Sequence, residues 1–507
     1  MITPCIFTRR PHHTTAQRGD ILVSVIVFSA VAVTVVIGLV NWGAALLSST
    51  RNLESREQAF QIAEAGLDYY RWHLAQYPTD YTDGTTTPQP YVHPYYDKDG
   101  VLIGSYALTI VPPVTGSTVV NITSVGSLAS SSISRTVQES LAIPSLAKFA
   151  VVANDNMTFG QGTTVYGPIQ SNKGIHFDGV AYNSVSSALT TYTDPDSSSC
   201  TTSNSWAVHT CIATADPASP GAMIDHSSDV FRAGRQISVP GFPFSSLSGN
   251  LSTLLSITAP NGVCSTPGCW SASGAQGYYI HMNTNNTFDM YKVTALVNAP
   301  SGCSTNGSTQ WGTWSVATKT VVGTYTVPSS GVIFVKDNIW VDGTINGTRV
   351  TIVAAADISN TNPDTYSNIT VNNDLKYTHT DGTDSIGLFA QGDINVGLVS
   401  ADSMEIDAAL IAANGRVGRH YYSSSCSVSS IAYWHRTSLT LTGMIATALR
   451  YGFAYSGTGY TCADTTTRSS GYCIRIINYD ANLLYSPPPS FPQATTQYQV
   501  IKWEQIN

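Results

Sequence analysis

Residues 21–50 read ILVSVIVFSAVAVTVVIGLVNWGAALLSST and contain no Asp, Glu, Lys or Arg. At a rise of about 1.5 Å per residue, a helix of about 20 such residues spans the roughly 30 Å hydrocarbon layer of a membrane. The preceding segment, residues 1–19, holds Arg9, Arg10 and Arg18 but no acidic residue. The positive-inside rule therefore predicts that this segment stays in the cytoplasm and that the rest of the chain is exported. A secretory signal peptide is the alternative, although its apolar core is usually only about 7–15 residues long.

The helical pattern continues beyond the apolar stretch. Apolar residues recur at steps of three, four or seven at Leu53, Phe60, Ala63, Leu67, Tyr70 and Leu74, which is the spacing of one helix face. We expect one helix of about 50 residues that starts in the membrane and ends near Pro78, because proline breaks a helix.

A short motif makes this N-terminus specific. The leader ends Gln17-Arg18-Gly19, and residues 57–67 read EQAFQIAEAGL. Together they resemble the N-terminus of type IV pilus minor pilins of the PilX type. The most discriminating part is the run A-F-x-x-A-E-A-G-L, here Ala59, Phe60, Ala63, Glu64, Ala65, Gly66 and Leu67. The resemblance implies that a prepilin peptidase cuts after Gly19 and methylates the new amino terminus, Asp20, and that the helix then packs into a pilus core.

Two positions depart from the family pattern. Ser24 is the fifth residue after the cleavage position, where major pilins have a glutamate that neutralises a neighbour's terminal amine. Serine cannot cancel a buried charge, and K-type pseudopilins and PilX-type proteins also often lack this glutamate. Ser24 therefore favours a tip or priming subunit over a major pilin. Asp20 replaces the usual Phe, Met or small residue, and an uncleaved single-span anchor is the alternative to processing.

The composition points to a mainly β fold beyond the helix. Only 11% of the 507 residues are charged, 42% are hydrophobic, and Gly and Tyr are abundant at 40 and 27 residues. This balance suits short strands joined by tight turns. The net charge of −8 offers no basic surface for phosphates, so we predict no nucleic-acid partner.

Alternating segments at 105–111, 119–125 and 133–141 predict a small antiparallel β meander after the stem. From about residue 149, a repeated pattern of two apolar residues, Val or Ala, two variable residues and Asn or Asp begins at 333, 352, 388 and more weakly at 410, with an early copy at 151. Steps near 20 residues are about one coil of a β-solenoid. Residues 163–177 and 479–504 also resemble segments of pilus-associated β-helix ectodomains.

These patterns predict four parts: a cytoplasmic leader (1–19), a transmembrane and stem helix (20–76), an antiparallel β meander (77–146) and a right-handed β-solenoid ectodomain (147–507). A β-sandwich is the alternative for the last part. The Ser/Thr-rich stretch at about 185–330 is expected to form inserted loops and irregular coils.

Eight cysteines follow the membrane segment, which fits disulfides made in an oxidising compartment. They are Cys200, Cys211, Cys264, Cys269, Cys303, Cys426, Cys462 and Cys473. Proximity favours Cys200 with Cys211, Cys264 with Cys269 and Cys462 with Cys473, which leaves Cys303 and Cys426. A zinc site at Cys264 and Cys269 is a weaker alternative, because neither a CxxC nor a nearby His pair accompanies them.

No HExxH, GxSxG or phosphate-binding glycine loop is present. The histidines, among them His176, His281, His420 and His435, look isolated and are expected to be structural. Because solenoids also host polysaccharide lyases and hydrolases, acidic residues between Asp357 and Asp407 deserve consideration, but corner geometry explains them without catalysis. Tyr421, Tyr422, Tyr433 and Trp434 either bind a glycan or partner or cap the end of the solenoid.

The sequence thus predicts a non-enzymatic minor pilin or pilus-tip subunit without cofactors, anchored in the bacterial inner membrane with its ectodomain outside. The expected partners are other pilins, the assembly platform, prepilin peptidase and a surface glycan or receptor. An uncleaved surface adhesin and a carbohydrate-active solenoid enzyme are the alternatives.

Overall fold

The computed structural model describes residues 20–196, 204–212, 214–217, 219–300, 303, 312–423, 426–456 and 469–506. The chain divides into two compact units. The first comprises Met1–Ile110, Ile122–Glu139 and Lys502–Asn507, and the second comprises Val111–Asn121 and Ser140–Ile501. A long apolar helix belongs to the first unit, and the second is mainly β.

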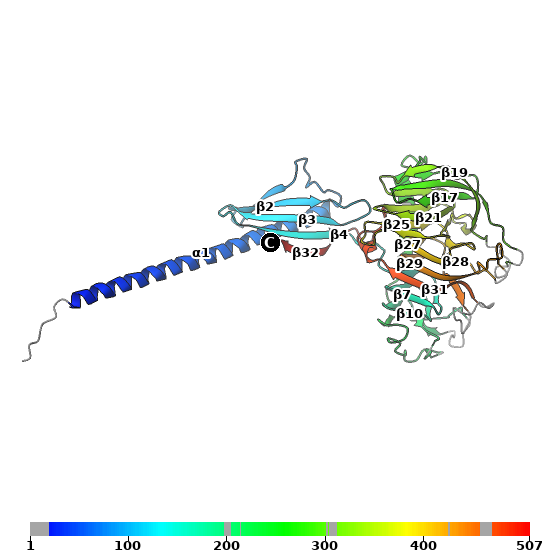
Figure 1. Ribbon diagram of the computed structural model, residues 1–507, viewed down its shortest axis with the longest axis horizontal. Helices are drawn as coiled ribbons and strands as arrows, with labels where there is room; N and C mark the ends of the chain where they lie inside the picture. Colours follow the sequence, from blue (N-terminus) through cyan, green and yellow to red (C-terminus); the bar gives the residue numbers. More distant parts are fainter. Residues whose placement is uncertain are drawn as a thin grey trace, which may run out of the picture. The chain divides into compact units, whose positions relative to one another are not determined.

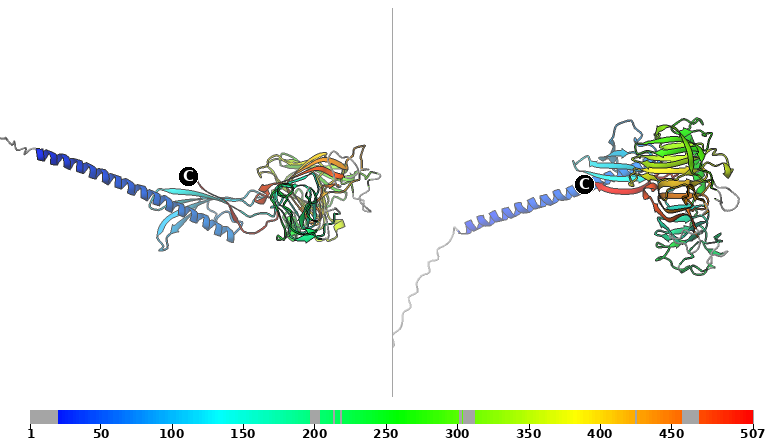
Figure 2. Two further views of the ribbon diagram at one scale, coloured as in Figure 1. Left: turned by 90° about the horizontal axis from the view of Figure 1, so that it is seen from below. Right: turned by 45° about the vertical axis from the view of Figure 1, so that its right-hand side comes forward.

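Helix α1 (Asp20–Gln76) is continuous over 57 residues (Figures 1 and 2). Its length agrees with the expectation from the sequence, and it ends two residues before Pro78. Within the apolar half, hydroxyl groups return hydrogen bonds to carbonyls one turn earlier: Ser29 Oγ donates to Val25 O at 2.6 Å, and Thr34 Oγ1 donates to Ala30 O at 2.7 Å. These polar groups are therefore satisfied inside the helix and need no water.

The second half of α1 packs against a sheet with strand order β1-β2-β3-β4-β32, in which β1 and β2 are antiparallel. The strands are β1 (Tyr91–Tyr96), β2 (Leu102–Val111), β3 (Val120–Leu128), β4 (Ser134–Ala142) and β32 (Gln499–Ile506). Burial along β3 alternates regularly between buried and half-buried residues, as expected of a strand with one face on a core. The C-terminal strand thus joins a sheet that the N-terminal part of the chain begins.

The second unit contains one long helix among its described residues, α2 (Phe244–Thr258), and many short strands. The elements before α2 are β5 (Val151–Ala153), β6 (Met157–Phe159), β7 (Thr163–Tyr166), β8 (Ile169–Ser171), β9 (Ile175–Phe177), β10 (Val180–Ala181), β11 (Val185–Ser187), β12 (Thr191–Tyr192), β13 (Ser205–Trp206), β14 (Val208–His209) and β15 (Arg235–Gln236). Those after it are β16 (Cys269–Trp270), β17 (Gly277–Met282), β18 (Thr287–Leu296), β19 (Val316–Thr326), β20 (Val332–Val335), β21 (Ile339–Ile345), β22 (Arg349–Ala354), η1 (Pro363–Thr365), β23 (Ile369–Thr370), β24 (Leu375–Tyr377), β25 (Ser385–Ala390), β26 (Ile394–Val396), β27 (Ser403–Ala412), β28 (Val417–Arg419), β29 (His435–Thr447), β30 (Ala454–Ser456), β31 (Ser469–Tyr479) and η2 (Ala481–Leu484).

A parallel ladder of strands organises this unit. Equivalent buried residues pair from strand to strand in the order Ile333, Ile352, Leu388, Leu410, Ile445, Val151, Ile169 and Val185. The copies aligned from the sequence at 333, 352, 388, 410 and 151 therefore lie side by side in the same register. The repeated apolar pattern marks strands that stack on one another.

The spatial order of the ladder differs from the order in the sequence. Its strands run β16, β20, β22, β25, β27, β29, β5, β8, β11 and β15. The chain enters in the middle at β5, proceeds to β15, passes through α2 and re-enters at β16 at the opposite end. In Figure 1, β29 and β31 lie between the green strands β17 and β19 and strand β7. β31 pairs with both β29 and β7.

The ladder is buried on both faces. Ile352, Leu388 and Leu410 belong to one apolar cluster, whereas the alternate residues Val353 and Phe389 belong to a second. Helix α2 contributes to the second cluster through Leu247, Leu251 and Leu254. Strands covered on both faces are expected to be apolar at consecutive positions, which explains runs such as Val332–Val335.

The stretch at about 185–330 differs from our expectation of loops and irregular coils. It contains α2 and the long antiparallel strands β17, β18 and β19. The Ser/Thr-rich composition hid a helical pattern, because Phe244, Leu247, Leu251 and Leu254 follow steps of three or four residues and are all buried.

Candidate functional site

The first half of α1 exposes apolar side chains on every face. Phe28 is 75% exposed and Trp42 is 64% exposed, and the Ile, Leu and Val residues between positions 21 and 47 are all at least half exposed. Among the described residues, this helix alone is long and apolar enough to cross a membrane. Monomeric soluble proteins rarely leave a continuous apolar surface of this size in water.

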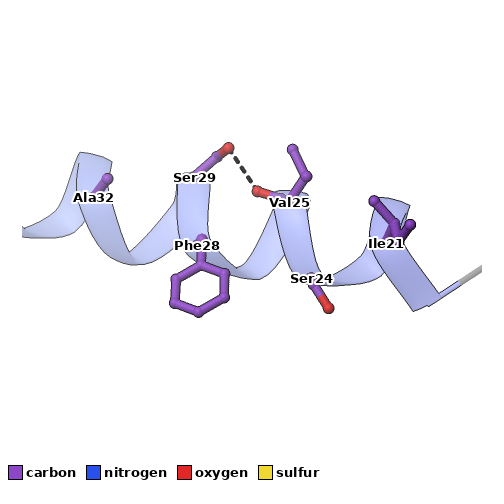
Figure 3. A pocket seen from close by; sticks show the side chains of 6 residues that line it. All are labelled: Ile21, Ser24, Val25, Phe28, Ser29 and Ala32. Carbon is purple, nitrogen blue, oxygen red and sulfur yellow. Dashed lines mark hydrogen bonds between the residues drawn. The ribbon is translucent and has the colours of Figure 1, made fainter.

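Ser24 lies on this exposed surface. Figure 3 shows Ser24 and Phe28 projecting from one side of the helix, with Ile21, Val25, Ser29 and Ala32 completing the lining of a shallow depression. A serine here supplies a hydroxyl but no charge. The predicted cleavage position Gly19 lies outside the described residues, and Asp20 is the first residue of α1.

The run A-F-x-x-A-E-A-G-L at residues 59–67 packs α1 against its sheet. Ala59, Ala63 and Leu67 are buried, and the backbone of Gly126 on β3 lies directly over the first two. A Cβ atom added at Gly126 would come within 2.2 Å of Ala59 O and 2.4 Å of Ala63 N. Small residues on both elements therefore permit a close approach of strand and helix.

The remaining residues of the run have different surroundings. Gly66 is also buried, and an added Cβ would lie 2.4 Å from Ser124 Oγ. Phe60 is half-buried and contacts Trp503 edge to face at a centroid distance of 6.2 Å. Glu64 and Ala65 are half-buried.

An ion pair with a buried carboxylate connects the second half of α1 to β4. Arg71 Nε donates to both carboxylate oxygens of Glu139 at 2.9 Å, and the Glu139 side chain is fully buried. Burial raises the pKa of Glu139, and the Arg71 guanidinium opposes that effect. A second carboxylate, Asp68, accepts from Arg71 Nη1 at 2.9 Å.

The disulfides lie in the second unit. Cys264 is bonded to Cys269, and Cys303 is bonded to Cys426. Cys211 and Cys473 are also disulfide-bonded; their expected partners, Cys200 and Cys462, lie outside the described residues.

The late aromatic residues largely form a core around the disulfide of Cys426. Tyr422 and Trp434 are buried in a cluster with Leu398 and Cys426, against which Tyr433 packs. Arg419 Nη1 donates to Trp434 O at 3.1 Å. Tyr421 is half-buried and contacts Tyr455 edge to face. Because Tyr422 and Trp434 are covered, they offer no open ring face for a sugar to stack on.

Two of the acidic residues considered for catalysis, Asp384 and Asp393, accept hydrogen bonds from backbone amides. Asn338 Oδ1 accepts from Asn368 N, Asn368 Oδ1 accepts from Asp393 N, and Asp393 Oδ1 accepts from Arg416 N, at 2.7–2.9 Å. Asp384 accepts from the backbone N of Thr348, Thr378 and His379. Asn and Asp at these positions therefore act as links between neighbouring layers of the chain.

A shallow cavity of about 300 Å³ lies beside β17, β19 and β21 and is lined by Tyr279, Lys319, Trp340 and Asp342, among others. Lys319 Nζ sits 3.3 Å from the centre of the Tyr279 ring, and the Tyr279 hydroxyl donates to Asp342. Burial raises the pKa of Tyr279, as does this bond. The Tyr279 ring, which lines this cavity, is thus covered on one face by a lysine.

Two histidines that look isolated in the sequence meet in the fold. His176 on β9 pairs with His209 on the parallel strand β14, and their rings stack at a centroid distance of 4.9 Å. Asp194 Oδ2 lies 2.9 Å from His176 Nδ1 and 3.2 Å from His209 Nε2. The expectation of an isolated His176 is therefore wrong, because strand pairing brings together residues that are 33 positions apart. No local motif signals this cluster.

The surroundings of the cluster are acidic. Burial lowers the pKa of His176, but hydrogen bonds and attraction from Asp178 and Asp194 outweigh burial and raise it to about 9. The same contacts with His176 and His209 hold the pKa of Asp194 below its usual range despite burial.

No protein-family model matches the chain, and no curated protein matches it significantly. Among solved structures, the chain is similar to the crystal structure of the competence-associated pilin ComZ from Thermus thermophilus, with 14% sequence identity and a TM-score of 0.28. The match covers 89% of this chain and 97% of that chain. A TM-score this low does not show a shared fold, so the likeness is no basis for assigning a function.

Proposed function

We propose that this chain is a pilin-like subunit of a type IV pilus system and, within that class, a minor subunit that primes a filament or occupies its tip. The proposal rests on the two different halves of helix α1. Its first half exposes apolar side chains on every face, and its second half is packed against a sheet. Such a helix needs lipid around it before assembly and the helices of other subunits after assembly.

The residue at position 24 supports the minor role. In a filament core, the terminal amine of each subunit is removed from water, and an unpaired buried charge costs several kcal/mol. Ser24 exposes only a hydroxyl at this position (Figure 3). A subunit without a carboxylate there suits a place where no neighbour's amine has to be neutralised.

The basic leader supports a location in the inner membrane with the second unit outside the cell. Its partners in this setting are other pilins, the assembly platform and the prepilin peptidase that cuts between Gly19 and Asp20. The parallel ladder supports interpretation of the second unit as a right-handed β-solenoid, since equivalent strands of a repeat pair in register. Displayed on a filament, it would serve adhesion to a glycan or receptor.

Processing provides the test. The chain is produced with and without a prepilin peptidase in one bacterial strain and detected with an antibody against the second unit. We expect the peptidase to remove the 19-residue leader, with mass spectrometry showing a methylated amino group on Asp20, and we expect the processed chain in sheared filaments.

Two glycine variants control this experiment. Gly19→Leu should block cleavage. Gly38→Leu should not, because an added side chain at Gly38 meets no atom within 4 Å in the isolated helix. An unchanged mass in the presence of the peptidase would refute pilin processing and favour an uncleaved surface adhesin. Release of products from a polysaccharide by the purified chain would instead favour a carbohydrate-active enzyme.

A further inference from the structure

Three buried ligand atoms from separate parts of the second unit meet in one cluster. They are Nδ1 of His176, Nε2 of His209 and Oδ2 of Asp194, and the two nitrogens lie 2.9 and 3.2 Å from the carboxylate oxygen. His176 is 5% exposed and His209 is 1% exposed. Buried polar atoms are costly unless each has a suitable partner, so the group that satisfies these three atoms has to be identified.

The opposite nitrogen of each ring fixes which atom faces the cluster. His176 Nε2 lies 3.0 Å from Asp178 Oδ2, and His209 Nδ1 lies 3.0 Å from Trp206 O. Both partners are acceptors, so these two nitrogens carry the protons and donate. For the nitrogens that face Asp194 to donate as well, both rings have to carry a positive charge inside a buried cluster, with their centroids only 4.9 Å apart. A cation among the three atoms is the alternative, because both nitrogens then act as acceptors beside the carboxylate.

The hydrogen bonds around the three atoms are those typical of a metal site. A histidine that binds a metal usually donates its other N–H to a carboxylate or a backbone carbonyl, which sets the ring orientation. Asp178 is itself held in place, because its Oδ1 accepts from Thr210 Oγ1 at 3.0 Å and from Cys211 N at 2.8 Å. Asp194 is oriented by the backbone N of Asp196, which donates to its Oδ1 at 2.9 Å.

We propose that His176, His209 and Asp194 bind a divalent transition-metal ion, with Zn²⁺ as the natural occupant. Two imidazoles and a carboxylate suit zinc and exclude calcium, which takes oxygen ligands. Tetrahedral bonds of about 2.0–2.1 Å separate neighbouring ligand atoms by about 3.3 Å. The two separations from Asp194 Oδ2, 2.9 Å to His176 Nδ1 and 3.2 Å to His209 Nε2, therefore need to open by only a few tenths of an ångström.

Asp196 is placed to provide the fourth ligand. Ligand atoms of His176, Asp194 and Asp196 lie within 4.8 Å of one another. Cys211 is equally near to the two histidines, but its sulfur is in a disulfide and is not a thiolate. The Asp196 carboxylate already accepts from Thr158 Oγ1 and Arg450, so a water molecule is the other candidate for this position.

The metal would link β9, β14 and the segment that carries Asp194. β6, β9 and β14 form a small sheet of their own, outside the main ladder. A structural zinc ion would stabilise this region as a disulfide does in small exported domains. This role is independent of the proposed pilus function, so either proposal can fail without the other.

The test uses the full chain in detergent, purified without a histidine tag and freed of metal with a chelator. We expect about one Zn²⁺ per chain to bind, the melting temperature to rise when Zn²⁺ is added, and Co²⁺ in its place to give the visible absorption of a tetrahedral site. His209→Gln should weaken Zn²⁺ binding by more than about 100-fold, and Asp178→Asn, which removes an outer partner, by about 10- to 100-fold. His379→Gln is the matched control, because His379 is 48% exposed and lies outside the cluster.

The outcomes distinguish a bound metal ion from a protonated histidine in the cluster. If the native chain retains no Zn²⁺ and its melting temperature does not respond to Zn²⁺, a protonated histidine fills the cluster and the proposal is wrong. Binding in His209→Gln equal to that of the native chain would also overturn it, as would selective binding of Ca²⁺. Should His209→Gln fail to fold, the graded loss in Asp178→Asn and the response of the native chain still decide the question.

Discussion

Gly126 provides the sharpest test of how the stem helix is held. Ordinary contact distances begin near 3.4 Å, whereas a Cβ at Gly126 would lie 2.2 Å from Ala59 O and 2.4 Å from Ala63 N. In a close-packed interior, Gly126→Ala therefore forces β3 and α1 apart locally by about 1 Å. Overpacking of this kind costs about 1–3 kcal/mol, a large part of the roughly 5–15 kcal/mol that stabilises a typical domain.

Hydrogen exchange measures this cost where it arises. In the full chain in detergent, Gly126→Ala should accelerate amide exchange in β3 and in the second half of α1 by roughly 5- to 150-fold, and it should leave the second unit unchanged. Gly249→Ala is the matched control, because Gly249 lies on α2 with no atom within 4 Å of an added Cβ, and alanine favours helix there. Native exchange rates in Gly126→Ala would refute the argument that this contact requires glycine.

Three further substitutions test other contacts. Arg71→Met leaves the buried Glu139 carboxylate unpaired and should destabilise the first unit by roughly 3 kcal/mol. This loss of stability should shrink at acidic pH, where Glu139 is protonated. An equal loss at all pH values would contradict the charge argument. Asp407→Asn should raise the stability of the second unit above pH 6. Burial raises the pKa of Asp407 to about 6 from 3.8. The native chain therefore loses stability as the pH rises from about 4 through 6, by up to ~3 kcal/mol. Chemical unfolding at pH 4 and pH 7.5 measures this difference, and a variant without a pH-dependent gain would show that the carboxyl is not strained. Leu254→Ala should cost about 2–5 kcal/mol in the same assay, because Leu254 is fully buried, whereas Ile257→Ala on the exposed side of α2 should cost little; equal losses would mean that α2 does not cover the ladder.

Elements with a strong local period were predictable from the sequence. The charge-free stretch and the spacing from Ala63 to Leu74 gave α1 nearly its observed end, because a helix face repeats at fixed intervals. The aligned repeats gave the register of the ladder, since each copy places Ile352, Leu388 or their equivalent at the same buried position. In both cases the information lies in a short local pattern, a helix face in one and a strand-length repeat in the other.

Features that depend on distant parts of the chain were not predictable. The position of β5 between β29 and β8 arises from pairing between Val151 and Ile445, and nothing near either residue indicates it. The histidine cluster has the same origin, because His209 reaches His176 only through the pairing of β14 with β9. Helix α2 is a different case: its apolar spacing was present in the sequence, but its serines and threonines favoured loops over helix.

The spatial order of the ladder has a consequence for folding. β5 is among the first strands of the second unit to be synthesised, yet one of its two neighbours, β29, is among the last. Until residues 445–447 arrive, the edge of β5 that pairs with them stays open, and an open apolar edge invites pairing with another chain. Contacts this distant in sequence also slow folding. Because the last strands pair with β5 in the middle of the ladder, completion of the second unit depends on the entire chain. An incompletely synthesised molecule therefore cannot form the finished ladder.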